Sequence, residues 1–187
     1  MAVFVSMLRG VNLAGHRKID MRELRALYES LGFRDVQTYI NSGNVIFRAA
    51  ARDLAKLAKR IEDAIERSHG FRSDVILRTA ADLREVIAQN PFGSRKDIEP
   101  NKLAITFLAV SPNREVIEKL MAFRIAPEEL HVAGRELFIY FANGMARPKL
   151  SMAMVERALK IPGTSRNWNT TRKLLELAEK LEATSST

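Results

Sequence analysis

Cysteine is absent from the 187 residues, which excludes disulfide bonds, thiolate metal sites and thiol nucleophiles. The sequence also has no run of about 18 or more apolar residues, the length that a membrane-spanning helix needs. The apolar run at residues 2–8 has neither a basic segment before it nor a small-residue cleavage site after it, so we interpret it as a strand and not as a signal peptide. We therefore expect a cytoplasmic protein that does not enter the membrane.

Several catalytic patterns are absent as well. The three histidines, His16, His69 and His131, lie on separate predicted elements and show no H-E-x-x-H spacing, so the sequence indicates no metal site. No G-x-S-x-G motif is present, which excludes the class of serine hydrolases that carry their nucleophile in that motif. A Ser-His-Asp set assembled across the fold stays open, and no cofactor is expected.

The excess of positive charge is concentrated in two segments. The chain carries a net charge of +8, and its 47% hydrophobic and 28% charged residues are typical of a folded domain. Residues 9–18 contribute +3 and residues 147–173 contribute +6, whereas the rest of the chain sums to −1. Segmental basicity indicates a surface that faces an anion, although charge retained for solubility gives the same pattern.

Hydrophobic periodicity predicts a strand–helix–strand–strand–helix–strand order in the first half, the split βαβ or ferredoxin-like pattern. These elements are expected at residues 3–8, 21–31, 36–40, 45–47, 52–68 and 75–77. Asp20 is the expected N-cap of the first helix, because its carboxylate can accept from the first amides of the helix. A short helix at residues 79–89 follows, and then the turn-rich segment 90–100, which we interpret as a linker.

The second half repeats this order in a shortened form. A strand is expected at residues 103–110, a helix opened by Ser111-Pro112, a hairpin at 129–132 and 136–141, and helices at 151–159 and 170–181. The sequence therefore predicts an α+β protein of two ferredoxin-like subdomains related by duplication, the second with a C-terminal helix in place of its last strand. The expected boundaries are residues 1–89, a linker at 90–100, and residues 101–187.

The loop at residues 10–15 (GVNLAG) lies between a strand and a helix, as a phosphate-binding P-loop does. A P-loop requires Lys and then Ser or Thr directly after its second glycine, and here these positions hold His16 and Arg17. Asp20 at the helix start would also occupy amide donors and repel a phosphate. We therefore set aside a nucleoside triphosphatase. The loop retains three candidate ligand-binding residues, Arg9, Asn12 and Lys18.

The hairpin turn carries a second group of polar residues, Asn41, Ser42 and Asn44. Hairpin geometry explains these residue types, and ligand binding is the alternative. The strand that follows, NVIFR at residues 44–48, lacks the aromatic pattern with which an RNA-recognition domain stacks bases. We therefore set aside that class despite the basic charge, and we expect Phe4 on the first strand to lie in the core.

The segment at residues 165–173 (SRNWNTTRK) is the third group. With Asn169 or Thr170 as the N-cap, Arg172 and Lys173 would lie in the first helical turn, where cations oppose the helix dipole. An anionic ligand or a carboxylate of the fold would remove that conflict. Trp168 is the single tryptophan, and it either presents an amphipathic ring to a ligand or locks the last helix onto the body of the protein.

Three segments resemble the signature segments of one protein family: LRGVN at residues 8–12, TYINSGNV at 38–45 and RNWNT at 166–170. Their order and spacing resemble those of the family called domain of unknown function 1697, whose members are uncharacterised bacterial proteins. The resemblance covers essentially the whole chain. The resemblance implies two ferredoxin-like α+β subdomains. Residues 13–15 (LAG) depart from the Val-Gly-Gly-like run expected there. The resemblance implies no reaction, cofactor or catalytic residue.

We therefore consider three hypotheses. The first is a binding module for an anionic small molecule, a nucleotide or a nucleic acid at the junction of the two halves. The second is a small-molecule enzyme acting on a carboxylate- or phosphate-bearing substrate. The third is that the motifs are purely structural. The candidate ligand-binding residues are Arg9, Asn12, Lys18, Asn41, Ser42, Asn44, Arg166, Asn167, Trp168, Arg172 and Lys173.

Overall fold

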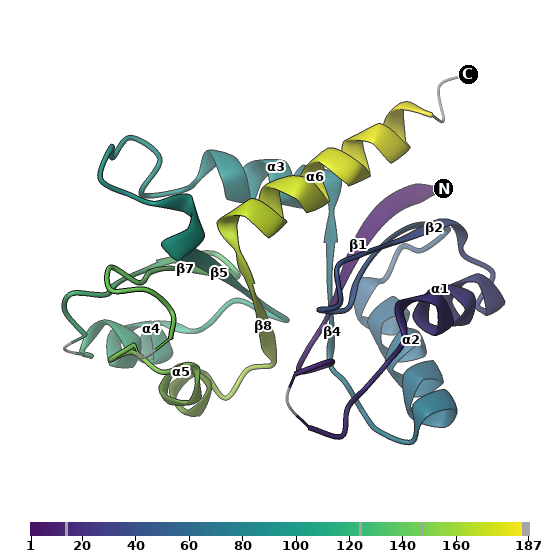
Figure 1. The fold of residues 1–187 in the computed structure, drawn as a ribbon, viewed down its shortest axis with the longest axis horizontal. Helices are drawn as coiled ribbons and strands as arrows, with labels where there is room; N and C mark the ends of the chain where they lie inside the picture. Colours follow the sequence, from purple (N-terminus) through teal and green to yellow (C-terminus); the bar gives the residue numbers. More distant parts are fainter. Residues whose placement is uncertain (14, 124, 147, 185–187) are drawn as a thin grey trace. The chain divides into compact units, whose positions relative to one another are not determined.

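The computed structural model of the protein describes residues 1–13, 15–123, 125–146 and 148–184 (Figure 1). Ala14 and Arg147, which belong to the loop motif and to the second basic segment, lie outside the described residues. The elements are β1 (Ala2–Leu8), α1 (Met21–Ser30), β2 (Arg34–Tyr39), β3 (Asn44–Ala49), α2 (Leu54–His69), β4 (Val75–Thr79), α3 (Ala80–Ala88), the 3₁₀ helix η1 (Pro100–Lys102), β5 (Leu103–Leu108), α4 (Arg114–Met121), β6 (Glu129–Ala133), β7 (Glu136–Tyr140), α5 (Met152–Leu159), β8 (Gly163–Asn167) and α6 (Trp168–Ala183).

The first half forms an antiparallel sheet in the order β2-β3-β1-β4. Helices α1 and α2 lie on one face of this sheet (Figure 1). Both helices begin at an aspartate whose carboxylate accepts backbone N–H groups, Asp20 for α1 and Asp53 for α2. Such caps satisfy amides that have no partner within the helix. The ferredoxin-like order predicted for this half is confirmed.

The core between this sheet and its helices is built around aromatic side chains. Tyr28 on α1 packs edge-on against Phe33 and Phe47, with ring centroids 5.8 and 5.2 Å away. Phe4 lies 5.9 Å from Phe47, so its predicted place in the core is confirmed. The buried Tyr28 hydroxyl lies 2.7 Å from the Ser6 Oγ, which satisfies both polar groups.

The second half forms an equivalent antiparallel sheet in the order β6-β7-β5-β8, with α4 and α5 packed on one face. The expectation that a C-terminal helix replaces the fourth strand is wrong, because β8 (GTSRN) pairs with β5 along its whole length. Its sequence has no run of apolar residues, so periodicity does not reveal it. Gly163 permits the pairing, because a Cβ there would lie 2.8 Å from the Leu108 side chain and 3.0 Å from the Phe107 carbonyl oxygen.

The two halves match residue by residue at their last strands. Arg78 on β4 pairs with Val5, and Arg166 on β8 occupies the equivalent place opposite Ile105. Each of these strands runs directly into a helix, α3 or α6. The duplication therefore covers seven elements per half, with η1 outside the repeat, and the second half has one strand more than the sequence indicates.

Contacts divide the chain into two compact units, and the boundary between these units is not the boundary between the two repeated halves. One unit comprises residues 1–84 and the chain from Lys173 onward, and the other comprises residues 85–172. Within the first unit, Arg48 on β3 donates to the Leu181 carbonyl oxygen, and Arg84 pairs with Glu179 and Glu182 at 2.7 and 2.6 Å. The expected boundaries, residues 1–89 and 101–187 around a linker at 90–100, stay a prediction.

Within the described ranges, every helix falls short of the length and apolar character that crossing a bilayer requires.

Candidate functional site

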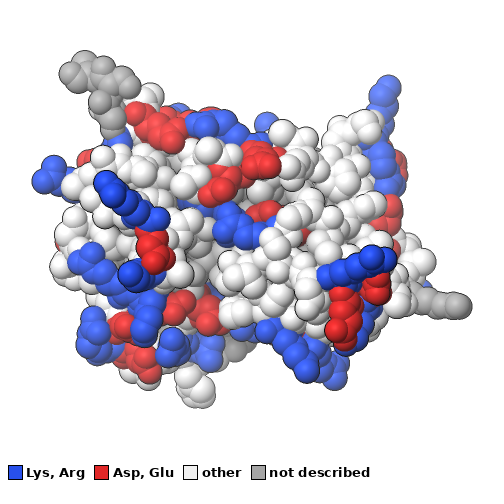
Figure 2. All heavy atoms as spheres, turned by 180° about the vertical axis from the view of Figure 1, so that it is seen from behind, with Lys and Arg blue, Asp and Glu red and all other residues white. Residues whose placement is uncertain are grey.

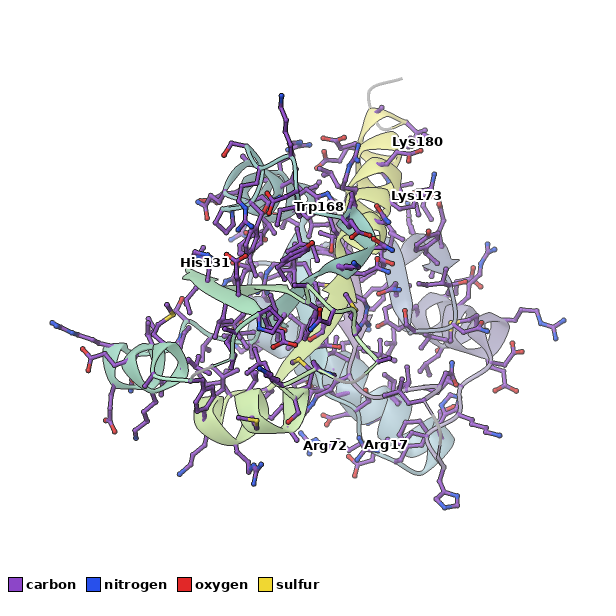
Figure 3. All side chains as sticks on the ribbon, turned by 60° about the vertical axis from the view of Figure 1, so that its left-hand side comes forward. Arg17, Arg72, His131, Trp168, Lys173 and Lys180 are labelled. Carbon is purple, nitrogen blue, oxygen red and sulfur yellow. The ribbon has the colours of Figure 1, made fainter. Side chains whose placement is uncertain are left out.

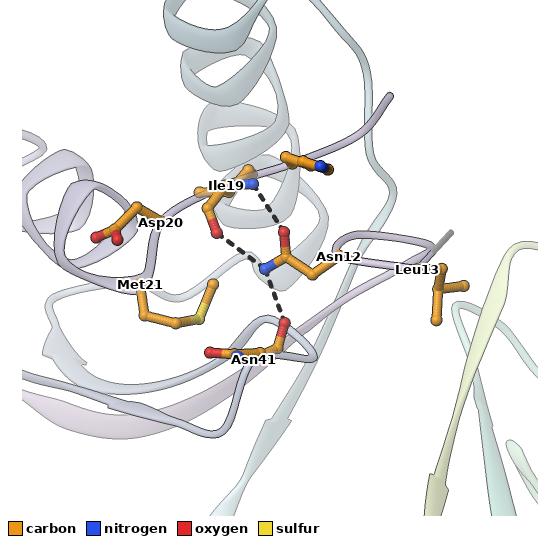
Figure 4. Close-up of a pocket in the computed structure, with 7 residues that line it drawn as sticks. Asn12, Leu13, Ile19, Asp20, Met21 and Asn41 are labelled. Carbon is orange, nitrogen blue, oxygen red and sulfur yellow. Dashed lines mark hydrogen bonds between the residues drawn. The ribbon is translucent and has the colours of Figure 1, made fainter. Parts of the chain in front are cut away.

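Asn12 organises the loop between β1 and α1. Its side-chain Nδ2 donates to the carbonyl oxygens of Ile19 and Asn41, each at 2.8 Å, and its Oδ1 accepts the Ile19 N–H at 2.9 Å (Figure 4). The Asn12 backbone N–H donates to the Arg17 carbonyl oxygen at 2.8 Å. The residue has a φ of 55°, a left-handed conformation that asparagine tolerates better than most residues. The amide therefore joins the loop to the hairpin turn.

The hairpin turn itself is closed by hydrogen bonds within the first unit. Asn44 is fully buried, and its Nδ2 donates to the Tyr39 carbonyl oxygen at 3.0 Å and to the Ser42 Oγ at 2.8 Å. The Leu8 N–H donates to the Gly43 carbonyl oxygen at 2.9 Å. These contacts support a structural role for Asn44 and Ser42.

Arg9 lies where β1 ends and β4 begins. Because the two strands are antiparallel neighbours, the residue after β1 meets the residues before β4. The Arg9 Nη1 lies 3.1 Å from the Asp74 Oδ2, and both side chains are about one-third exposed, at 34% and 35%. The Ser73 hydroxyl donates to the Arg9 carbonyl oxygen at 2.9 Å. Arg9 is therefore held by the fold, with part of its guanidinium facing solvent.

A shallow cavity of about 340 Å³ lies beside Asn12. Its polar side chains belong to Asn12, Lys18, Asp20 and Asn41. Apolar side chains from the loop and from the start of α1 complete the lining (Figure 4). Hydrogen bonds from the Arg22 backbone N–H lower the pKa of the Asp20 carboxyl. Capping therefore explains this pKa shift. The lowered pKa lies further from the pKa that a general acid needs at neutral pH.

Arg166 and Asn167 lie at the end of β8. Arg166 is 8% exposed, and its Nη1 donates to the Thr164 Oγ1 at 2.8 Å and to the Ser165 carbonyl oxygen at 2.9 Å. Burial lowers the pKa of Arg166 to about 10, which leaves the guanidinium protonated at neutral pH. The Asn167 Oδ1 accepts the Thr170 N–H at 2.7 Å, so Asn167 caps α6.

The prediction that Arg172 and Lys173 lie in the first turn of the last helix is wrong. Helix α6 begins at Trp168, two residues earlier than expected, so both cations lie in the second turn. The Lys173 Nζ also donates to both carboxylate oxygens of Glu176 at 2.9 Å. A carboxylate of the fold therefore stands opposite Lys173, and the expected conflict with the helix dipole does not arise. Arg172 is exposed.

Lys173 and Lys180 lie on the same side of α6, and both bind Glu176 (Figure 3). Hydrogen bonds from Lys180 and Lys173 lower the pKa of the Glu176 carboxyl from 4.5 to about 2. A carboxyl whose pKa is lowered by folding stabilises the folded state above its unfolded pKa, and this stabilisation is lost as the pH falls toward the folded value. The interaction is therefore complete above pH 4.5 and disappears toward pH 2.

Glu176→Gln is accordingly expected to flatten the dependence of the melting temperature on pH between about 5 and 2. The melting temperature of the variant should lie below that of the wild type at pH 7 and approach it at pH 2. Circular dichroism at a series of pH values measures this. Glu66→Gln on α2 is the control, because Glu66 is exposed and its carboxylate has no ion pair among the described residues. Equal pH profiles for the wild type and Glu176→Gln would contradict the prediction.

Trp168 is the first residue of α6 and is half-buried (Figure 3). Its position therefore fits packing and leaves part of the ring accessible. Charges of both signs are interspersed over the face of the molecule in Figure 2. The two basic segments of the sequence therefore do not make that face uniformly basic.

The histidines occupy three unrelated environments. His16 is exposed, the His131 ring packs edge-on against Phe92 with centroids 5.0 Å apart, and His69 lies on α2 with its Nε2 3.7 Å from a Glu23 carboxylate oxygen. Among the described residues there is no group of three or more His, Asp or Glu side chains that could hold a metal ion.

The structure brings the loop at residues 9–18 and the turn at residues 40–43 together in the first unit. Arg166, Asn167, Trp168 and Arg172 belong to the second unit, whereas Lys173 belongs to the first. Sequence reasoning did not name Asp20 as a cavity residue, nor Asp74 and Glu176 as the partners of motif cations. The spacing of Lys173, Glu176 and Lys180 could have indicated the last contact, but the pairing with Asp74 depends on the sheet.

Comparisons with known proteins agree with this architecture. A conserved bacterial protein, SP0830 from Streptococcus pneumoniae, has a similar structure, with a TM-score of 0.72, 23% sequence identity, and coverage of 96% of this chain and 99% of that chain. No curated protein matches the sequence. The signature of the family described as protein of unknown function (DUF1697) matches residues 1–138. With most of its length matched, the chain belongs to the DUF1697 family of proteins of unknown function.

Proposed function

We propose that the chain is a binding module for an anionic ligand, a nucleotide or a nucleic-acid segment, held by the loop at residues 9–18 and the turn at residues 40–43. The observation that carries this proposal is the state of Arg17 and Lys18. Both are exposed, and neither side chain has a hydrogen bond or ion pair to another described residue. Lys18 also lines the cavity beside Asn12. Adjacent cations without carboxylate partners are suited to phosphate oxygens.

The candidate residues between positions 166 and 173 support this proposal less. Arg166 is buried and Asn167 caps a helix, while Lys173 binds Glu176. Arg172 and the accessible part of Trp168 are the parts of this group that a phosphate or a base could contact.

A structural role for the motifs is the second proposal, and specific contacts favour it for three asparagines. The side chains of Asn12, Asn44 and Asn167 each hydrogen-bond backbone atoms of neighbouring segments. These residues would then shape the loop, the turn and the helix start, and the exposed cations would contact the ligand.

Neutralising the two cations tests ligand binding. Arg17→Gln/Lys18→Gln is expected to weaken binding of a short fluorescein-labelled oligothymidylate about tenfold or more at low salt. It should also reduce the slope of log affinity against log salt concentration by about 1.4, since each phosphate contact on a single strand contributes about 0.7. Fluorescence anisotropy measures both quantities, and calorimetry with adenosine 5′-monophosphate provides the nucleotide arm.

The matched control is Arg52→Gln/Lys56→Gln, which makes the same change in net charge in the same unit. Arg52 and Lys56 are exposed, and Lys56 lies 3.8 Å from Asp53. If the control loses as much affinity and salt dependence as the loop variant, binding depends on net charge and the proposed site is wrong. If the wild type binds neither probe at low salt, the proposed function is wrong.

A further inference from the structure

The cavity beside Asn12 combines two polar groups that are not used within the described part of the fold with the exposed carboxylate of Asp20, which also caps α1. The Lys18 ammonium and the Asn41 side-chain amide have no hydrogen bond to a described residue. The Asp20 Oδ1 accepts the Arg22 N–H at 2.8 Å and lies 3.5 Å from the Arg22 Nε, and the Glu23 N–H is a second backbone donor to the carboxylate. The cavity thus offers a cation, an amide and an exposed carboxylate, whose two oxygens can together accept about four hydrogen bonds.

Apart from Asn12, the remainder of the lining is apolar. Leu13 is 69% exposed, Met21 is half-buried, and Ile19 contributes from the buried end of the loop (Figure 4). A ligand that covered Leu13 would remove a large exposed apolar side chain from water. The volume of about 340 Å³ lies near the lower end of the range of about 300–1,000 Å³ for small-molecule sites. It suits a small ligand of about the size of one nucleotide.

Building on the proposed function, we propose that this cavity takes a phosphate monoester that carries a neutral N–H or O–H donor and an apolar ring face, the class of a nucleoside monophosphate. Lys18 pairs with the phosphate, the Asp20 carboxylate accepts from a ribose hydroxyl or a ring amine, and Leu13 and Met21 cover the ring. Asp20 is the residue that sets this selectivity.

The sign of the Asp20 contribution follows from its charge. An aspartate carboxyl is ionised at neutral pH, and the backbone hydrogen bond from Arg22 lowers the pKa of Asp20 further. A bare inorganic anion in so small a cavity would bring its own negative oxygens near that carboxylate and be repelled. A ligand that presents a donor to the same carboxylate gains a charge-assisted hydrogen bond. Asp20 should therefore favour the ester and disfavour the inorganic ion.

Asp20→Asn tests this selectivity without removing the helix cap, because asparagine caps helices about as well as aspartate. Isothermal titration calorimetry would compare adenosine 5′-monophosphate with inorganic phosphate. We expect Asp20→Asn to bind the nucleotide about tenfold more weakly and inorganic phosphate more tightly, whereas Lys18→Gln should weaken both. Asp53→Asn is the matched control, since Asp53 caps α2 in the same unit and is absent from the cavity lining. It should change neither affinity.

The outcomes separate this inference from the proposed function. If Asp20→Asn strengthens binding of both probes, or changes them equally, Asp20 does not select the ligand and the inference is overturned while anion binding stands. If the wild type binds inorganic phosphate as tightly as the nucleotide, the inference is again overturned. If the wild type binds neither probe nor the oligonucleotide, both proposals fail. Melting curves of each variant would confirm that its fold is retained.

Discussion

Gly43→Ala is expected to lower the free energy of unfolding by about 2–5 kcal/mol. The φ of Gly43 is 74°, where a residue with a Cβ pays about 1–2 kcal/mol. The added Cβ would also lie 2.6 Å from the Val11 Cγ2 and 2.9 Å from the Leu8 Cβ, and such overpacking costs about 1–3 kcal/mol. Urea denaturation measured by circular dichroism gives the change.

Gly32→Ala separates the two causes. Gly32 has nearly the same φ, 77°, but a Cβ there would meet no atom within 4 Å. We therefore expect a loss of about 1–2 kcal/mol from the backbone conformation alone. Equal losses in the two variants would show that the close approach of the hairpin turn to Leu8 and Val11 contributes nothing to stability.

Asn12→Ala is expected to destabilise the protein by a similar amount, about 2–5 kcal/mol. Three hydrogen bonds of the Asn12 side chain are lost, each contributing about 0.5–1.5 kcal/mol. Alanine also tolerates the φ of 55° less well than asparagine. Denaturant unfolding again provides the measurement. Asn12→Gly, which relieves the backbone while losing the same bonds, should recover part of the loss.

Asn41→Ala is the control for this prediction. The Asn41 carbonyl oxygen accepts from Asn12, but its side chain is exposed and has no hydrogen bond to a described residue, so we expect a change of no more than about 0.5 kcal/mol. In the proposed site the same variant should weaken nucleotide binding. A large loss of stability in Asn41→Ala, or none in Asn12→Ala, would contradict the division between organising and ligand-contacting residues.

Much of the fold follows from local sequence patterns. The cap at Asp20, the apolar spacing of α1 and α2 and the hairpin around Gly43 are local features, and each predicted the element that forms there. The fourth strand of the second half is different. Residues 163–167 (GTSRN) become a strand because β5 offers an unpaired edge, and this is a property of the sheet and not of the segment.

The start of α6 shows the same dependence. Asn167, Asn169 and Thr170 are all suitable N-cap residues, and the sequence does not choose among them. Asn167 is selected because β8 pairs with β5 as far as Asn167, opposite Ala104, so the chain leaves the sheet there and enters the helix at once. The shift moves Arg172 and Lys173 into the second turn and removes the argument for an anion at the helix start.

The sequence by itself determined the α+β class and the repeated ferredoxin-like order, because these depend on apolar periodicity, caps and turns within short segments. The resemblance to the family rests instead on the signature segments at residues 8–12, 38–45 and 166–170. The sequence also located the basic loop that we propose as the site. The tertiary structure decided which motif side chains bind other residues of the protein. Arg9 meets Asp74 across neighbouring strands, and Asn12 meets Asn41 across the loop and the turn. Such contacts join residues that are far apart in the chain, so only the packed sheet and its loops bring them within hydrogen-bonding distance.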